Sequence, residues 1–133
     1  MKYEEKTRKI RSFNDLVAWQ EAHILVVLIY QCTREFPNDE RFSLTNQLRR
    51  AVISVTSNIA EGFGRQSPKE KVQFYYLANG SLLEVKSQLF AAKDLQYITQ
   101  GVFNDTMEQA DRAQSILRGL IRSCPNLSHP SSS

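Results

Sequence analysis

The sequence has few of the residues that cross-link a small protein or interrupt its helices. Its 133 residues include five Gly, four Pro and two Cys. So few Gly and Pro residues argue against a β-sandwich, which needs many turns. Cys32 and Cys124 are far apart and lack a metal-ligand or redox spacing, so we expect two reduced thiols. A chain of this length buries about two-thirds of its unfolded surface and needs no disulfide or metal to fold.

Long apolar segments are also absent. The longest apolar run, residues 24–30, has seven residues, whereas a membrane-spanning helix needs about 20. The first twelve residues are rich in charge, and the apolar segment of a signal peptide does not follow them. We therefore expect one soluble, cytoplasmic domain that does not contact a membrane.

Excess positive charge is confined to the beginning of the chain. The net charge is +3, and residues 1–12 contain five basic and two acidic residues. The rest of the chain contains 12 basic and 12 acidic residues, so it is formally neutral. We expect a disordered basic arm over residues 1–12, a folded body over 13–124 and a disordered tail over 125–133.

Apolar periodicity predicts a first helix over residues 14–36, capped by Asn14 and stopped by Pro37. Its residues 24–30 are apolar on every side, a pattern that also suits a buried strand. The helix is favoured because the periodic pattern extends back to Leu16 without a turn signal. A helix that is apolar all round is covered on more than one side, so we infer that a second subunit covers its outer face.

Three further helices follow. The second is expected over residues 44–61, with Gly62 and Gly64 ending it in the left-handed conformation. The third begins at the capping box formed by Ser67 and Glu70 and runs to residue 95 or 97. The fourth spans residues 102–123 and is capped by Thr99. Four helices joined by short loops predict an all-α, antiparallel up-down-up-down four-helix bundle.

The chain offers little material for a catalytic or metal centre. A di-iron bundle needs Glu-x-x-His on two helices, and this pattern does not occur. One of the two histidines, His23, lies inside a helix and is expected to be a packed or interface residue rather than a ligand, and the other, His129, lies in the tail. We therefore predict that the protein is not an enzyme and uses no cofactor and no metal.

Polar residues on otherwise apolar stripes have two interpretations. The first is a hydrogen-bonded network that fixes the register of the helices; the second is a polar cleft that binds a ligand. Gly80 lies in the middle of the third helix, where we expect a neighbouring helix to approach closely. The residues of the predicted network are Asn58, Glu61, Gly62, Gly80, Ser81 and Glu84, together with an arginine.

The folded body has one basic segment. Residues 41–71 contain six basic residues and two acidic ones. This segment is either a solvated face or a phosphate-binding surface, and a symmetric ring would repeat the surface so that its field adds. The candidate nucleic-acid-binding residues are Arg49, Arg50, Arg65, Lys69 and Lys71.

Several motifs support a family resemblance. They are Phe13-x-x-Leu16-x-x-Trp19-x-x-Ala22, Phe36-Pro37-x-x-Glu40-x-Phe42-x-Leu44-Thr45-x-Gln47-Leu48-Arg49-Arg50-Ala51, Ser57-Asn58-Ile59-Ala60-Glu61-Gly62-x-Gly64-Arg65 and Ala78-x-Gly80-Ser81-Leu82-x-Glu84. Over residues 13–98 the chain resembles the four-helix-bundle proteins encoded in intervening sequences of bacterial 23S ribosomal RNA genes. Thr56 departs from the family pattern, which often has proline there.

The resemblance implies a four-helix bundle and a ring-shaped homopentamer. The chain is also similar to the accessory variability proteins of diversity-generating retroelements, which pair with a reverse transcriptase and nucleic acid. No catalytic residue is carried over by the resemblance. We predict an oligomeric adaptor that binds structured RNA (ribosomal RNA) or DNA, or a nucleic-acid-handling protein. The alternative is a protein-interaction scaffold without a direct nucleic-acid role.

Overall fold

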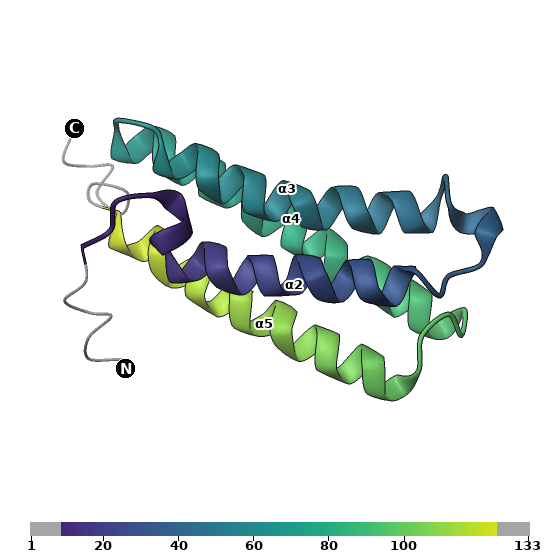
Figure 1. The fold of residues 1–133 in the computed structure, drawn as a ribbon. Coiled ribbons are helices and arrows are strands. Elements are labelled where there is room, and N and C mark those ends of the chain that lie inside the picture. Colours follow the sequence, from purple (N-terminus) through teal and green to yellow (C-terminus); the bar gives the residue numbers. More distant parts are fainter. Residues whose placement is uncertain (1–8, 125–133) are drawn as a thin grey trace.

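The computed structural model describes residues 9–124, which form an antiparallel bundle of four helices (Figure 1). The α-helices are α2 (Val17–Thr33), α3 (Leu44–Phe63), α4 (Pro68–Asp94) and α5 (Gln100–Ser123), and two short 3-10 helices are η1 (Phe13–Asp15) and η2 (Asn38–Glu40). Successive helices run in opposite directions, which confirms the predicted topology. Each packs against its sequence neighbours, and α2 also contacts α5, so α2 and α4 occupy opposite corners. The expected C-terminal tail and most of the expected N-terminal arm lie outside the described residues.

The first helix is shorter than its apolar pattern predicts. Asn14 is not its N-cap but lies inside η1, and α2 begins at Val17. At the other end α2 stops at Thr33 rather than Phe36. The backbone N–H of Phe36 donates to the Thr33 carbonyl at 3.1 Å, so the chain tightens into a 3-10 turn before Pro37. Proline disfavours the helical conformation in the residue before it, which explains the early end.

The apolar stripes meet in one continuous core. Full burial of one such side chain contributes roughly 1.5–3 kcal/mol to stability. The outer face of α2 is different, because Ile24 and Val27 each remain 45% exposed. The other three helices therefore do not cover every side of residues 24–30, the run that is apolar all round. The largest fully buried side chains are Leu25, Ile29, Leu48, Val52, Val55, Ile59, Tyr75, Leu82, Val85, Leu89 and Leu117.

Gly62 has a different role from the predicted one. It does not end a helix: it lies inside α3, which continues to Phe63. A Cβ atom at this position would lie 2.7 Å from Cε1 of the buried Tyr75. Gly64 is the C-cap, but its φ of −77° is right-handed, so the predicted left-handed helix stop is wrong. Gly62 thus allows α3 and α4 to pack closely.

The ends of α4 and α5 follow the capping rules closely. Ser67 accepts a hydrogen bond from the backbone N–H of Glu70, and Thr99 accepts one from Val102, as the sequence predicts. The end of α4 holds the one positive φ outside glycine among residues 9–124, at Gln96 (φ 65°). The N–H of Tyr97 donates to the carbonyl of Ala92, which completes a Schellman motif without glycine.

Gly80 does not mark a close contact within the chain. A Cβ atom built there would meet nothing within 4 Å. The expectation that a neighbouring helix approaches Gly80 is therefore wrong for the described part of the bundle. Glycine in a helix interior costs about 1 kcal/mol relative to alanine, and packing inside this chain does not explain that cost.

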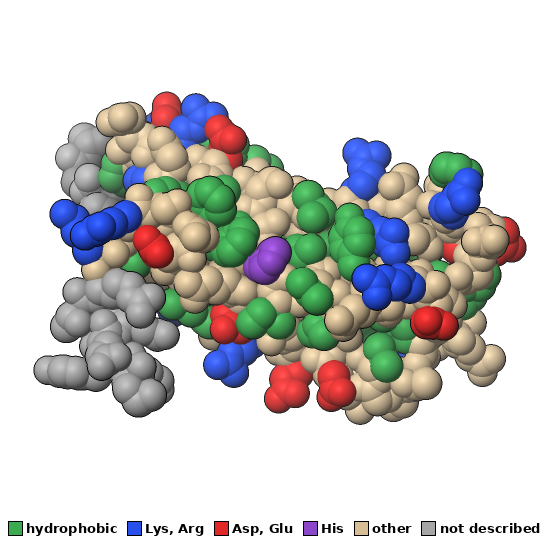
Figure 2. All heavy atoms as spheres, viewed as in Figure 1, with side chains coloured by type: hydrophobic (Ala, Val, Ile, Leu, Met, Phe, Trp, Pro, Cys, Tyr) green, Lys and Arg blue, Asp and Glu red, His purple; other side chains and the backbone are tan. Residues whose placement is uncertain are grey.

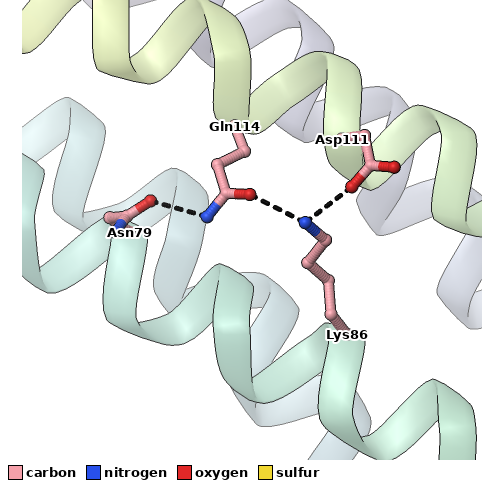
Figure 3. Close-up of polar contacts among 4 residues, drawn as sticks. All are labelled: Asn79, Lys86, Asp111 and Gln114. Atoms are coloured by element: carbon pink, nitrogen blue, oxygen red, sulfur yellow. Dashed lines mark hydrogen bonds and ion pairs between the residues drawn. The ribbon is translucent and has the colours of Figure 1, made fainter.

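A polar network joins α4 to α5 (Figure 3). Gln114 is only 3% exposed. Its amide donates to Asn79 Oδ1 at 3.0 Å, and its carbonyl accepts from Lys86 Nζ at 2.7 Å. Lys86 also pairs with Asp111 at 2.6 Å. Because an unsatisfied buried amide is costly, this network fixes the register of the two helices.

Candidate nucleic-acid interface

The predicted basic patch is divided between the two ends of α3. Arg49 and Arg50 lie in the second turn of this helix. Arg65 lies in the α3–α4 loop, and Lys69 and Lys71 lie in the first turn of α4. About 20 Å of helix separates the two groups at 1.5 Å per residue. One bound phosphate cannot contact both groups.

The basic group at the α3–α4 loop is largely committed to contacts within the chain. Arg65 pairs with Glu61 at 2.7 Å. Lys71 Nζ donates to the Phe63 carbonyl at 2.7 Å. Lys69 is exposed. Of these three basic residues, Lys69 is therefore the one without such a contact.

The predicted polar network is smaller than expected and has a different centre. Asn58 Nδ2 donates to the carbonyl and the hydroxyl of Ser54, at 2.9 and 3.0 Å. Ser81 Oγ donates to Ser54 Oγ at 2.9 Å and so ties α4 to α3. Glu61 is not part of this network, and Glu84 is exposed and lines a hollow with Arg50 and Ser54 of α3. The hydrogen bonds of Asn58 and Ser81 support the structural interpretation of these residues.

At the other end of α3, Arg49 is held in a fixed position. Its Nε donates to Thr33 Oγ1 at 2.8 Å, and Thr33 Oγ1 donates to the Ile29 carbonyl at 2.7 Å. The guanidinium lies over the Tyr30 ring, 4.5 Å from its centroid. These contacts leave both terminal amino groups of Arg49 without a hydrogen-bond partner in residues 9–124. They can donate to an anion.

Arg49 lines a cavity of about 140 Å³ where α2, η2 and α3 meet. Two further arginines, Arg34 and Arg41, line the same cavity, and no carboxylate residue does. Figure 2 shows basic side chains gathered at this end of the bundle. Guanidinium groups donate in a fork that matches a phosphate group. The complete lining is Thr33, Arg34, Phe36, Pro37, Asn38, Arg41, Thr45 and Arg49.

Arg50 extends the basic end along α3. It is exposed and lines two shallow hollows of about 280 and 420 Å³, one on each side of it. We call Arg34, Arg41, Arg49 and Arg50 the arginine end. The sequence singled out the last two as candidates but missed Arg34, which lies just before the break at Pro37.

Phe42, one of the motif residues, lies at the same end and, like Arg41, was not among the predicted site residues. Its side chain is 82% exposed, the largest value among the big apolar residues between positions 9 and 124. The Arg41 guanidinium lies over the ring, 4.9 Å from the centroid. The dipeptide Arg41-Phe42 in a turn between helices was the signal that could have identified both residues.

Acidic residues near the arginine end limit its positive field. Glu35 and Asp39 are exposed close to the cavity in sequence. Glu40 has a lowered pKa because its carboxylate accepts hydrogen bonds from the Tyr97 hydroxyl and then from Ser43. It also accepts from the N–H at the start of α3. The arginines therefore act at short range rather than as a broad basic surface.

The described residues contain no group of three or more His, Cys, Asp or Glu that could hold a metal ion. Burial raises the pKa of the Cys32 thiol to about 11 and also raises that of Cys124. His23 is not packed in the core but stacks on Trp19 at the surface, with the ring centroids 4.7 Å apart. No helix between residues 9 and 124 has the length and apolar character needed to cross a membrane.

The comparisons agree with the fold. A search of curated proteins finds no match. A solved structure of a protein of unknown function from the S23 ribosomal protein family of Bacteroides thetaiotaomicron superposes with a TM-score of 0.74. The two chains are 19% identical, and the match covers 80% of this chain and all of the other. The model of the 23S rRNA-intervening sequence protein family matches residues 14–119, most of the bundle, and the chain belongs to this family.

Proposed function

We propose that this protein is a non-enzymatic, self-associating protein that binds RNA through its arginine end. The observation that carries the proposal is the cavity lined by Arg34, Arg41 and Arg49, with Arg50 beside it and no carboxylate in its lining. The guanidinium of arginine can donate two parallel hydrogen bonds to a phosphate group. Phosphate and sugar oxygens accept at least half of the hydrogen bonds that proteins donate to DNA. The family name, which refers to an intervening sequence in ribosomal RNA, supports RNA over DNA as the ligand.

The binding test is an equilibrium titration against structured ribosomal RNA, structured non-ribosomal RNA and duplex DNA at several salt concentrations. Each neutralised phosphate contributes a log–log salt slope of about −0.9 on duplex DNA and about −0.7 on single strands. Replacing both Arg34 and Arg41 with Gln should weaken binding and flatten the slope by roughly one to two units. Replacing both Arg118 and Arg122 with Gln is the matched control, because it removes the same charge from exposed residues on α5 that do not line the cavity.

Three outcomes are informative. If the Arg34/Arg41 variant binds every nucleic acid with the slope of the native protein, the arginine end is not the interface. A larger loss for Lys69→Gln would move the interface to the α3–α4 loop. Tighter binding of duplex DNA than of any RNA would correct the proposed ligand.

Self-association is supported by the outer face of α4. Tyr76, Leu77, Leu83 and Phe90 are 48–60% exposed on this helix, and all are large apolar side chains. Three of them, Tyr76, Leu83 and Phe90, recur every seven residues, the spacing at which one helix packs along another. Gly80 lies between them with open space in front of it. A second copy that approaches there would explain both the exposed stripe and the glycine.

A second apolar face lies over α2, at the opposite corner of the bundle. It includes Val17, Ile24 and Val27 on α2, each 41–45% exposed (Figure 2). Because the α2 and α4 faces are distinct and do not adjoin, the α4 face of one copy can pack on the α2 face of the next. Such head-to-tail contacts form a ring when the rotation closes. The homopentamer implied by the resemblance is a ring of this kind.

The assembly is tested by measuring molecular mass in solution. Leu83→Arg on α4 and Ile24→Glu on α2 should each reduce the assembly to small species. Mixing the two variants should restore one contact and give a heterodimer, because each variant keeps one intact face. A mixture that stays monomeric while the native protein assembles would rule out the α2–α4 contact. A monomeric native protein would rule out self-association.

The second candidate function is a protein-interaction scaffold, and the same α4 stripe favours it. A partner helix with an apolar face could occupy the stripe in place of a second copy. This candidate gains support if the native protein is monomeric and shows no salt-dependent binding to nucleic acid. Capture of one defined protein by the native chain, lost in Leu83→Arg, would then establish it.

A further inference from the structure

Packing within the fold does not explain the exposure of Phe42. The residue lies in the turn between η2 and α3, 82% exposed. Its one ring contact among residues 9–124 is with the Arg41 guanidinium, which is also at the surface. Unlike Tyr76 and Phe90 on α4, it does not belong to an apolar stripe on a helix. An exposed phenyl ring beside arginines is suited to stacking on a planar ligand such as a nucleic-acid base.

The cavity beside this ring has the dimensions and chemistry of a phosphate site. Its volume of about 140 Å³ exceeds that of a phosphate group, and arginines from the C-cap of α2, the η2–α3 turn and α3 line it. Arg49 is fixed by Thr33 and Tyr30 and keeps its two terminal amino groups available. Asn38 and Thr45 add polar side chains to the lining.

Arg41 connects the two features. It lines the cavity, and its guanidinium lies 4.9 Å from the centroid of the Phe42 ring. The charged cavity and the aromatic ring are therefore close together, as are the phosphate and the base that the sugar joins in one nucleotide. Resting on the proposed RNA-binding function, we propose that the arginine end binds an unpaired nucleotide, with its base stacked on Phe42 and its phosphate in the cavity.

The local charge favours an unpaired nucleotide over a long duplex. Residues 34–41 contain two arginines against three acids, so the region lacks the broad positive field that follows a duplex backbone. A base inside a duplex is stacked on its neighbours and cannot reach a phenyl ring, whereas bases in loops, bulges and ends can. The recognised element is thus an unpaired segment of a structured RNA.

The test compares a labelled single-stranded RNA with a fully paired duplex of the same sequence. Phe42→Ala should weaken single-strand binding by on the order of 5- to 100-fold and leave the salt slope unchanged. It should leave duplex binding unchanged. Leu95→Ala is the matched control, because it removes another large exposed apolar side chain, 54% exposed, from the α4–α5 loop, outside the arginine end and both apolar faces. Because Phe42 is so exposed, both variants should retain the circular dichroism and melting temperature of the native protein.

A second variant reports stacking directly. The chain has one tryptophan, Trp19, in the first turn of α2. It lies about 20 Å along this helix from the arginine end. Phe42→Trp should bind single strands and show fluorescence quenching that the native protein lacks. Native affinity in Phe42→Ala, or no quenching in Phe42→Trp, would overturn the stacking proposal.

The same variants separate this inference from the function on which it rests. If Arg34→Gln with Arg41→Gln weakens binding but Phe42→Ala does not, RNA binding stands and the unpaired-nucleotide site is wrong. If the native protein binds no RNA at all, both fail. Equal losses of affinity for single strands and duplex in Phe42→Ala would also overturn the site. Single-stranded DNA in a parallel titration shows whether the site distinguishes the two sugars.

Discussion

Two glycines in the bundle predict opposite effects of the same substitution. At Gly62 a new Cβ would lie 2.7 Å from Tyr75 Cε1 and 3.0 Å from the Lys71 carbonyl. Tyr75 is 2% exposed, so its ring has no room to move away. Overpacking of this kind typically costs 1–3 kcal/mol, and the helix propensity of alanine returns at most about 1 kcal/mol. Gly62→Ala should therefore destabilise the protein by roughly 1–2 kcal/mol.

At Gly80 the added methyl group meets nothing within 4 Å. Within one copy only the helix propensity changes, so Gly80→Ala should stabilise the monomeric bundle by about 0.5–1 kcal/mol. Thermal and urea unfolding at two protein concentrations measure both variants and show any contribution from self-association. For a chain of this size 1 kcal/mol corresponds to roughly 3–6 °C in Tm. A Gly62→Ala variant as stable as the native protein would refute the packing argument for α3 and α4.

Three further predictions concern buried and capping groups. Gln114→Ala should destabilise the bundle by roughly 2–3 kcal/mol in urea unfolding, because it opens a cavity and removes one hydrogen-bond acceptor of Lys86. A loss of stability below about 0.5 kcal/mol would show that the α4–α5 network does not fix the register of the two helices. The pKa of Cys32 is raised from 9.0 to about 11 by burial, so the thiolate is favoured in the unfolded chain. The free energy of unfolding should fall as pH rises from about 9 to 11, and Cys32→Ala should lessen that fall. The pKa of Glu40 is lowered, mainly by its hydrogen bond from Tyr97, so its contribution is present above pH 4.5 and is lost as pH falls through the folded pKa. Glu40→Gln should flatten the acid side of the stability profile; an unchanged profile would contradict this assignment.

Much of the fold could be predicted from local signals. The caps at Ser67 and Thr99 need only a few neighbouring residues, and the buried stripes need only helical periodicity. Apart from the ends of α2, which local turns set, the errors include one where the outcome depends on another helix. Gly62 resembles a helix stop in sequence, yet the ring of Tyr75 on α4 decides its role. Gln96 adopts the left-handed conformation that glycine usually adopts at the end of a helix. The sequence therefore has no glycine there to signal the end of α4.

The candidate site could be predicted only in part, for a geometric reason. A count of charges over residues 41–71 treats basic residues as neighbours, whereas α3 holds Arg49 and Arg65 far apart. The same helix brings Arg49 next to Arg34, which the count omitted. Contacts of this kind depend on how α2 and α3 pack against each other. Helical periodicity and a count of charges do not reveal that packing.

The two proposed surfaces depend on each other energetically. Three acids lie among the arginines of one arginine end, so a single copy should hold RNA weakly. The residues that define the apolar faces of α2 and α4 do not line the cavity of the arginine end, so head-to-tail packing does not use that cavity. In a closed ring each arginine end recurs around the axis, and a long RNA that engages one end meets the next at a raised effective concentration. Each arginine end would bind one unpaired nucleotide weakly. Self-association would thus raise the affinity of the assembly for an RNA that has several unpaired segments.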